Sequence, residues 1–287
     1  MASFFAVARK APELQDGKRP TAATDVWALG VVAFQLLAMT GRHPFSSKDA
    51  SSNGVVGVKE ERLESVRAKQ GAFNLSALAS LPGRAGLKAR HLVASCCAPL
   101  PGNRPSAAAV ASHPLFWSAP AAGERLHALN DRRLSEEALR AALQPRPPGL
   151  NEGLYDSLSA WQDKIDARLL AAVTGSRRGY APGLVSLLRF GRNAMERADE
   201  TRRDNPGVIE ALAGGQRPPG APTSDAVAEH LFSALPGLAL AVHLCSQHAV
   251  DEARPAEGAA VASDASAKRP AGHSAPVAAK PRERKGR

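Results

Sequence analysis

The longest apolar stretch of the chain, residues 26–39, limits what the first part of the sequence can fold into. It is too short to span a bilayer, which takes about 20 apolar residues, so we expect a buried core helix. Elsewhere no stretch alternates apolar and polar residues with enrichment in β-branched side chains, the pattern typical of strands. The sequence therefore predicts a mainly α protein.

Composition divides the 287 residues into three zones. Residues 1–118 are mixed and helical in pattern, and residues 119–250 are helix-rich with Pro/Gly-rich interruptions. Residues 251–287 consist mostly of Ala, Pro, Lys and Arg, and cannot bury enough apolar surface to offset their chain entropy. We predict one domain at 1–118, a second at 119–250, and a disordered basic tail at 251–287.

Charge and cysteine content narrow the class of protein. The net charge of +10 and the pI near 10.0 favour an anionic partner such as nucleic acid or an acidic membrane face. A basic tail on an ordinary soluble protein would give the same totals. Cys96, Cys97 and Cys245 fit neither a disulfide framework nor a zinc spacing, so we expect no metal site and a reducing, cytoplasmic location. No signal peptide or membrane segment is predicted.

Four short motifs follow one another along the first domain. They are A-P-E at 11–13, D-V-W-A-L-G at 25–30, H-P-F at 43–45, and N-R-P-S at 103–106, which leads to H-P-L-F-W at 113–117. In this order and spacing they resemble the motifs that shape the helical C-lobe of protein kinases. The resemblance implies a partial kinase C-lobe whose start is truncated. Such a lobe should leave apolar surface bare.

The resemblance gives three of these residues structural roles. It pairs Glu13 with Arg104 as a buried ion pair, whose disruption would cost about 3–5 kcal/mol; the alternative is two unrelated surface charges. It places Asp25 where kinases bind the backbone of the catalytic loop. No H-R-D, D-F-G, glycine-rich loop or V-A-I-K motif occurs in the chain, so we expect neither kinase activity nor ATP binding.

The region after Trp117 resembles the kinase-extension nuclease domain of the inositol-requiring unfolded-protein sensor and ribonuclease L. The similar stretches lie at 118–137, 160–170, 180–197, 207–215 and 228–244. With the kinase motifs, the likeness covers roughly residues 8–250. It implies an all-helical nuclease domain fused to the kinase lobe, which cleaves stem-loop RNA by 2′-hydroxyl attack without metal or cofactor. It also implies a homodimer, and a full-length parent that could be anchored in the endoplasmic reticulum membrane.

Residues 184–197 carry the chemistry of this second resemblance. They predict an amphipathic helix on which Arg189, Asn193 and Arg197 recur at i, i+4 and i+8, with Arg192 beside them. Guanidinium and amide groups on one face suit phosphate oxygens, although solvated arginines on an ordinary helix give the same pattern.

The resemblance assigns catalytic roles to Tyr180, Arg192 and Asn193, with Tyr180 aligned by deleting one residue in the turn that follows it. Arg189 and Arg197 are then phosphate-binding candidates. Arg197 stands where the family has a histidine, and a guanidinium cannot exchange protons at neutral pH. Losing a general acid typically slows a reaction by ~10²–10⁴.

Three hypotheses follow. The first is the C-terminal part of an unfolded-protein-response kinase/endoribonuclease. The second is a catalytically silent RNA-binding or dimerisation module, favoured by Arg197. The third is a truncated serine/threonine kinase with an unrelated helical extension. Cyclic phosphate ends on cleaved RNA would separate the first two.

Overall fold

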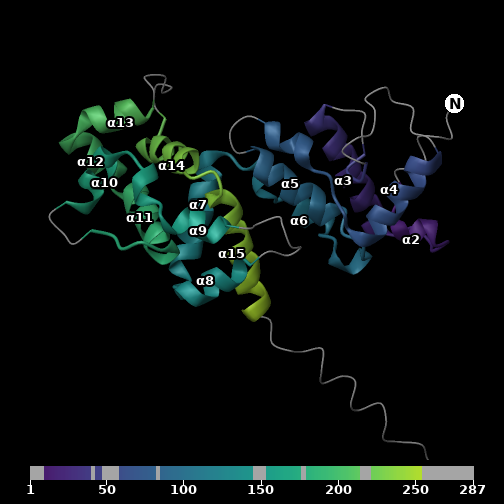
Figure 1. Cartoon of the computed structure of the whole chain (residues 1–287). Helices are drawn as coiled ribbons and strands as arrows, with labels where there is room; N and C mark the ends of the chain where they lie inside the picture. Colours follow the sequence, from purple (N-terminus) through teal and green to yellow (C-terminus); the bar gives the residue numbers. More distant parts are fainter. Residues whose placement is uncertain are drawn as a thin grey trace, which may run out of the picture. The chain divides into compact units, whose positions relative to one another are not determined.

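The computed structural model describes residues 10–39, 43–46, 58–81, 85–144, 153–175, 179–213 and 221–253. Within these ranges every regular element is a helix, so the chain is mainly α, as the sequence predicts (Figure 1). The α-helices are α2 (Pro12–Gln15), α3 (Ala22–Ala38), α4 (Val58–Gln70), α5 (Ala85–Cys96), α6 (Ala107–Ala111), α7 (Ala119–Asp131), α8 (Glu136–Ala142), α9 (Leu154–Ser159), α10 (Ala167–Thr174), α11 (Leu184–Glu196), α12 (Ala198–Asp204), α13 (Pro206–Leu212), α14 (Thr223–Ala234) and α15 (Leu238–Ala253). The 3-10 turns are η1 (Ser76–Ser80), η2 (Pro101–Asn103), η3 (Pro114–Phe116) and η4 (Gln162–Lys164).

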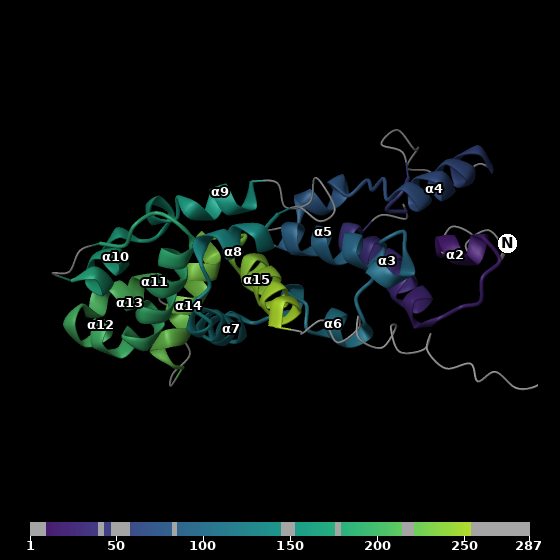
Figure 2. The same ribbon diagram turned by 90° about the horizontal axis from the view of Figure 1, so that it is seen from below.

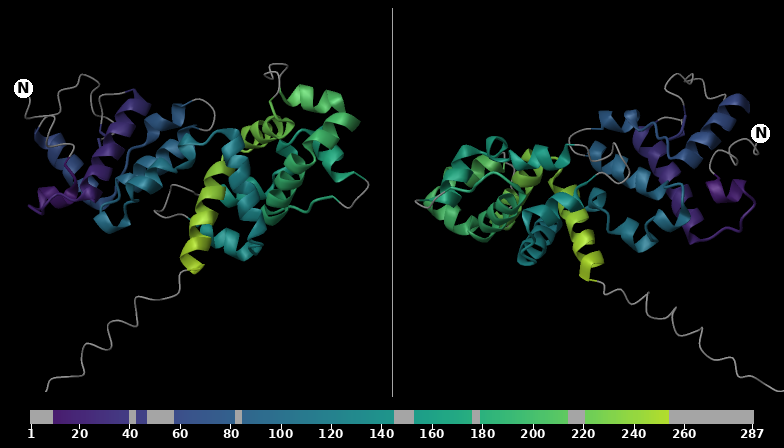
Figure 3. Two further views of the ribbon diagram at one scale, coloured as in Figure 1. Left: turned by 180° about the vertical axis from the view of Figure 1, so that it is seen from behind. Right: turned by 60° about the horizontal axis from the view of Figure 1, so that its bottom comes forward.

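Helix α3 organises the kinase-like part. It begins with a capping box between Thr21 and Thr24, which satisfies backbone donors of its first turn. The helix lies along α5, as both views of Figure 3 show. A Cβ atom on Gly30 would stand 2.6 Å from the Sγ atom of Cys97, so glycine is what allows the two helices to approach this closely. Buried Trp27 completes this face of α3.

The opposite face of α3 is apolar and exposed. Leu29, Val32, Leu36 and Met39 recur at helical spacing and are 46%, 37%, 72% and 91% exposed. Soluble proteins rarely leave so continuous an apolar stripe uncovered. The stripe is therefore a feature of the described residues that a partner surface could cover.

The extension is built around α11. Its first helix, α7, begins at Ala119, and α11 contacts α7, α8, α9, α10 and α14 (Figure 2). Glycine permits the crossing of α7 and α11, because a Cβ atom on Gly123 would lie 2.9 Å from the sulfur of Met195. The core formed here contains the fully buried Trp161 and Phe190. A central helix fixed on several sides gives its polar face a rigid support.

Three histidines are buried where α5 and α15 meet the end of the kinase-like part. His113 Nδ1 accepts a hydrogen bond from the Leu115 amide at 3.1 Å, so its proton lies on Nε2. That Nε2 is 3.0 Å from His91 Nδ1 and donates to it. The ring of His243 packs edge-on against both and against Trp117. The imidazoles of His91 and His113 are therefore neutral, and burial lowers the pKa of His243 to about 4, so its imidazole is neutral at neutral pH as well.

Helix α15 ends at Ala253, so the first residues assigned to the tail continue this helix. The rest of the predicted disordered tail, 254–287, lies outside the described residues. In the described part of the chain, no single helix is both long and apolar enough to cross a membrane. Helices α14 and α15 reach that length and apolarity only together, across a 95° bend.

Candidate nuclease site

The candidate site lies on the polar face of α11. The opposite face of this helix is buried, and its residues are Leu184, Leu187, Leu188, Phe190, Gly191, Ala194 and Met195. Arg189 is exposed, whereas Arg192, Asn193 and Arg197 are half-buried. The apolar face predicted from the sequence is thus the face of α11 that packs into the core, and the predicted polar face is accessible to solvent.

A half-buried carboxylate, that of Glu136, holds the start of α11. Glu136 accepts hydrogen bonds from the amides of Leu184 at 2.7 Å and Val185 at 2.9 Å, and from the Tyr155 hydroxyl at 2.7 Å. Burial raises the pKa of Glu136, but these hydrogen bonds outweigh burial and place the pKa below its ordinary value. Gly183, at φ 116°, leaves room for the carboxylate, because a Cβ atom there would lie 3.2 Å from it. The cap fixes the position of the helix that carries the site.

Tyr180 and Asn193 are in direct contact. The amide nitrogen Nδ2 of Asn193 donates a hydrogen bond of 2.8 Å to the hydroxyl oxygen of Tyr180. The tyrosine ring packs edge-on against Trp161 and Phe190, with ring centres 6.1 and 5.2 Å away. Gln162 donates to the Tyr180 backbone carbonyl at 3.3 Å. Ring and backbone are therefore both held, and the hydroxyl is directed at α11.

Arg197 adds a fixed positive charge near this pair. Its Nε donates to Glu200 at 2.8 Å, and a terminal nitrogen donates to the backbone carbonyl of Val173 at 3.3 Å. The hydrogen bond to Glu200 is the main cause that raises the pKa of Arg197, and its interaction with Tyr180 contributes in the same direction. Arg197 is thus a permanent cation that interacts with the phenol.

Arg192 directly precedes Asn193 on α11, so its side chain points about 100° away from that of Asn193 around the helix. Its Nε donates to Glu196 at 2.8 Å, and it lies 3.8 Å from a carboxylate oxygen of Asp131. His127 reaches the same Glu196 carboxylate at 3.8 Å. The structure therefore brings Tyr180, Asn193 and Arg197 together, and gives the predicted catalytic Arg192 carboxylate partners beside them.

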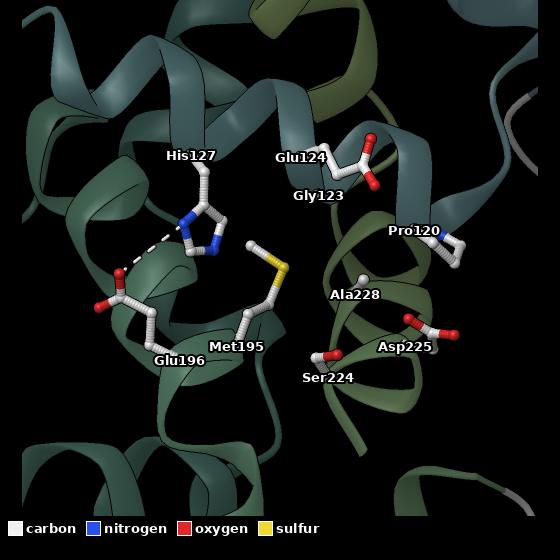
Figure 4. Close-up of a pocket in the computed structure, with 9 residues that line it drawn as sticks. All are labelled: Pro120, Gly123, Glu124, His127, Met195, Glu196, Ser224, Asp225 and Ala228. Carbon is white, nitrogen blue, oxygen red and sulfur yellow. Dashed lines mark ion pairs between the residues drawn. The ribbon is translucent and has the colours of Figure 1, made fainter. Parts of the chain in front are cut away.

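An open cavity of about 480 Å³ adjoins this part of α11 (Figure 4). His127 and Glu196 face each other at one end of it, and the thioether of Met195 lies between the helices (Figure 4). Glu124 and Asp225 add carboxylates, so the cavity is acidic. An acidic cavity does not suit an anion such as a phosphate.

The residues assigned to the kinase-like part form a separate structural cluster. Arg104 binds the Glu13 carboxylate through both terminal nitrogens, at 2.6 and 2.7 Å, and its side chain is fully buried. It also donates to three backbone carbonyls, those of Ala23, Ala98 and Pro99. The hydrogen bond from Arg104 is the largest cause that lowers the pKa of Glu13. Asp25 is exposed on the first turn of α3.

No set of three His, Cys, Asp or Glu side chains among the described residues is arranged to hold a metal ion. The three cysteines are buried thiols, and burial raises the pKa of Cys96 and of Cys245 to about 12. Their thiolates, the reactive forms, are therefore scarce at neutral pH.

Comparison with known proteins identifies what these two parts resemble. The protein kinase domain family matches residues 7–116. The serine/threonine-protein kinase/endoribonuclease IRE1 of Oryza sativa subsp. japonica is 29% identical over 246 residues, which cover 85% of this chain and 24% of that protein. IRE1 of Hypocrea jecorina is 32% identical over 184 residues, covering 63% of this chain and 13% of the relative. IRE1b of Arabidopsis thaliana is 28% identical over 201 residues, covering 68% and 20%.

The chain is IRE1-like. It spans about a quarter or less of the length of the curated relatives it matches. The similarity to rice IRE1 extends well past the kinase match, so it includes part of the helical extension that carries the candidate site.

Sequence reasoning missed two residues that shape the site of this IRE1-like chain. Glu136 lies within the stretch 118–137 that carries the resemblance. The residues around it do not indicate that its carboxylate caps a helix that begins 48 residues further along the chain. His127 lies one helical turn before Asp131, and only the packing of α7 on α11 brings it to Glu196.

Proposed function

We propose that this IRE1-like chain is an endoribonuclease that cleaves stem-loop RNA by attack of a ribose 2′-hydroxyl on the adjacent phosphate. The observation that carries the proposal is the hydrogen bond between Asn193 and Tyr180, with the Arg197 guanidinium close by. Amide, phenol and guanidinium are groups that hold a phosphodiester and stabilise charge on it.

Each residue has a distinct part in this proposal. Arg197 and the exposed Arg189 supply positive charge for the RNA backbone. Arg192 exchanges its carboxylate partners for a phosphate oxygen when RNA binds, which is possible because those ion pairs are partly solvated. Asn193 orients the tyrosine hydroxyl. The exposed loop of a stem-loop is the fitting substrate because its bases and 2′-hydroxyls are accessible.

The kinase-like part is not proposed to transfer phosphate from ATP. The motifs present in the kinase-like part are structural, and the sequence contains none of the kinase motifs that hold ATP, Mg²⁺ or the transferred phosphate. We propose that the kinase-like part is a scaffold. We also propose that the chain acts as a homodimer in the cytoplasm. A full-length protein that includes this chain would then act in the unfolded-protein response. Sedimentation of the purified chain tests the dimer.

The assay for cleavage uses a 5′-labelled stem-loop RNA. A 2′,3′-cyclic phosphate at the new end of the product resists phosphatase. After acid has opened the ring, phosphatase removes the phosphate, and this difference identifies the cyclic end. The wild type should yield cyclic phosphate ends at the loop, and Asn193→Ala should lose about 10²-fold or more in rate. Equal background from both proteins would refute the proposal.

A second function is favoured by one specific observation. Arg197 is held by Glu200 and Val173 as a permanent cation, so it cannot replace a histidine as proton donor. A module that binds RNA without cleaving it would keep every phosphate contact. It would bind the same stem-loop with an affinity that falls steeply with salt, and would give no cyclic ends.

A further inference from the structure

The hydrogen bond between Asn193 and Tyr180 determines where the phenol proton can go. The Asn193 amide nitrogen is a donor only, so the tyrosine oxygen is the acceptor in this bond. The hydroxyl hydrogen of Tyr180 is therefore not engaged by Asn193 and can be donated to another group. Tyr180 is half-buried rather than enclosed, so that group can be a bound substrate.

The surroundings of Tyr180 restrict how this hydroxyl moves. Trp161 and Phe190 pack against the ring, and Trp161 is fully buried within the core. Gln162 binds the backbone carbonyl of Tyr180 at 3.3 Å. A hydroxyl on a ring held in this way stays in one place while the substrate changes, as a proton donor must.

The charge nearby also favours proton donation. Giving up its proton leaves Tyr180 as a negatively charged phenolate. Arg197 interacts electrostatically with this tyrosine and is itself fixed by Glu200 and the Val173 carbonyl. A cation that interacts electrostatically with the phenol stabilises the anion that forms. The residue that replaces a histidine thus supports a proton transfer that it cannot perform.

We propose that Tyr180 is the general acid of the cleavage reaction, with Arg197 as the cation that stabilises its phenolate; this inference rests on the function proposed above. The ribose 2′-oxygen forms a bond to phosphorus and loses its proton to solvent water. The bond between phosphorus and the 5′-oxygen breaks, and the hydroxyl proton of Tyr180 passes to that 5′-oxygen. The products are a 2′,3′-cyclic phosphate and a 5′-hydroxyl, and solvent reprotonates the phenolate.

The test compares two stem-loop RNAs that differ in one atom. In the second, sulfur replaces the bridging 5′-oxygen at the cleaved bond, and the thiolate that leaves needs no proton. Tyr180→Phe keeps the ring and removes only the hydroxyl. It should slow cleavage of the oxygen substrate by ~10²–10⁴ and of the sulfur substrate by less than about tenfold. An equal loss on both substrates would overturn the assignment.

Two further measurements keep the result interpretable. Arg192→Ala, which removes a proposed phosphate contact and no proton donor, should slow cleavage of both substrates by the same factor. Far-UV circular dichroism of each variant establishes that the helices are retained. If the wild type cleaves neither RNA, the proposed function itself is refuted. If the wild type cleaves both and sulfur fails to rescue Tyr180→Phe, only the role of Tyr180 is refuted.

Discussion

Lowering the pH should destabilise the fold through its three buried histidines. Burial is the main cause that lowers their pKa values, to about 4 for His91, about 2 for His113 and about 4 for His243. The positive charges of Lys88 and Arg125 add to the effect on His113 and His243 respectively. In the unfolded chain each imidazole has a pKa of about 6.5. Below that pH the imidazoles bind protons in the unfolded state but not in the folded state, so the free energy of unfolding falls as the pH falls.

The size of the effect follows from these pKa values. At pH 5 an imidazole in the unfolded chain is almost fully protonated, whereas each buried one is still mostly neutral. Linkage then gives a loss of about 2 kcal/mol for each histidine between pH 8 and pH 5, or about 6 kcal/mol for the three. Domains are typically stable by only ~5–15 kcal/mol. The loss is therefore large enough to bring the protein close to unfolding.

The assay is urea denaturation followed by circular dichroism at pH 8 and pH 5. His243→Phe keeps an aromatic ring against Trp117 and removes one titrating group, so its loss between the two pH values should be smaller than that of the wild type by about 2 kcal/mol. Trp117→Phe is the matched control, because it alters the same packing without removing a titrating group. If His243→Phe and the wild type lose the same free energy, the imidazole is not held neutral and the reasoning is wrong.

Three other changes test the remaining structural claims. Arg104→Lys should lower the free energy of unfolding by about 3–5 kcal/mol, because lysine cannot replace the bidentate bond to Glu13, and a loss below about 1 kcal/mol in urea denaturation would contradict this. Gly183→Ala should lower the melting temperature, since it forces a side chain into positive φ and against the Glu136 carboxylate; an unchanged temperature would show that the cap relaxes freely. Leu36→Lys on the exposed stripe of α3 should change monomer stability by no more than about 0.5 kcal/mol, and a larger loss would mean that the stripe is covered in solution.

Much of the fold could be predicted from local patterns. The apolar stretch at 26–39 becomes most of α3, which ends at Ala38. Periodicity could identify the helices because a helix needs one apolar face, and the kinase motifs could place Glu13 near Arg104 because the resemblance carries their pairing. Periodicity does not show which helix becomes central, since that depends on packing between segments far apart in sequence.

The site was predictable only in part, for a similar reason. The sequence places Arg192 and Asn193 side by side, but their side chains meet different parts of the chain. Asn193 faces Tyr180, whereas Arg192 lies by Glu196 and Asp131 on α7. Adjacent positions on one helix point in different directions, so adjacency in sequence does not imply a shared role.

The central claim is that RNA is cleaved by its own 2′-hydroxyl at the Tyr180 side of α11, with no metal taking part. The most direct measurement is single-turnover cleavage, in a buffer containing EDTA, of two stem-loop RNAs, one all-ribose and one with a single 2′-deoxy sugar at the cleaved position. We predict that the all-ribose RNA gives cyclic phosphate ends and that the 2′-deoxy RNA stays intact at that bond. Cleavage of the 2′-deoxy RNA there, or no cleavage of either RNA, would contradict the account.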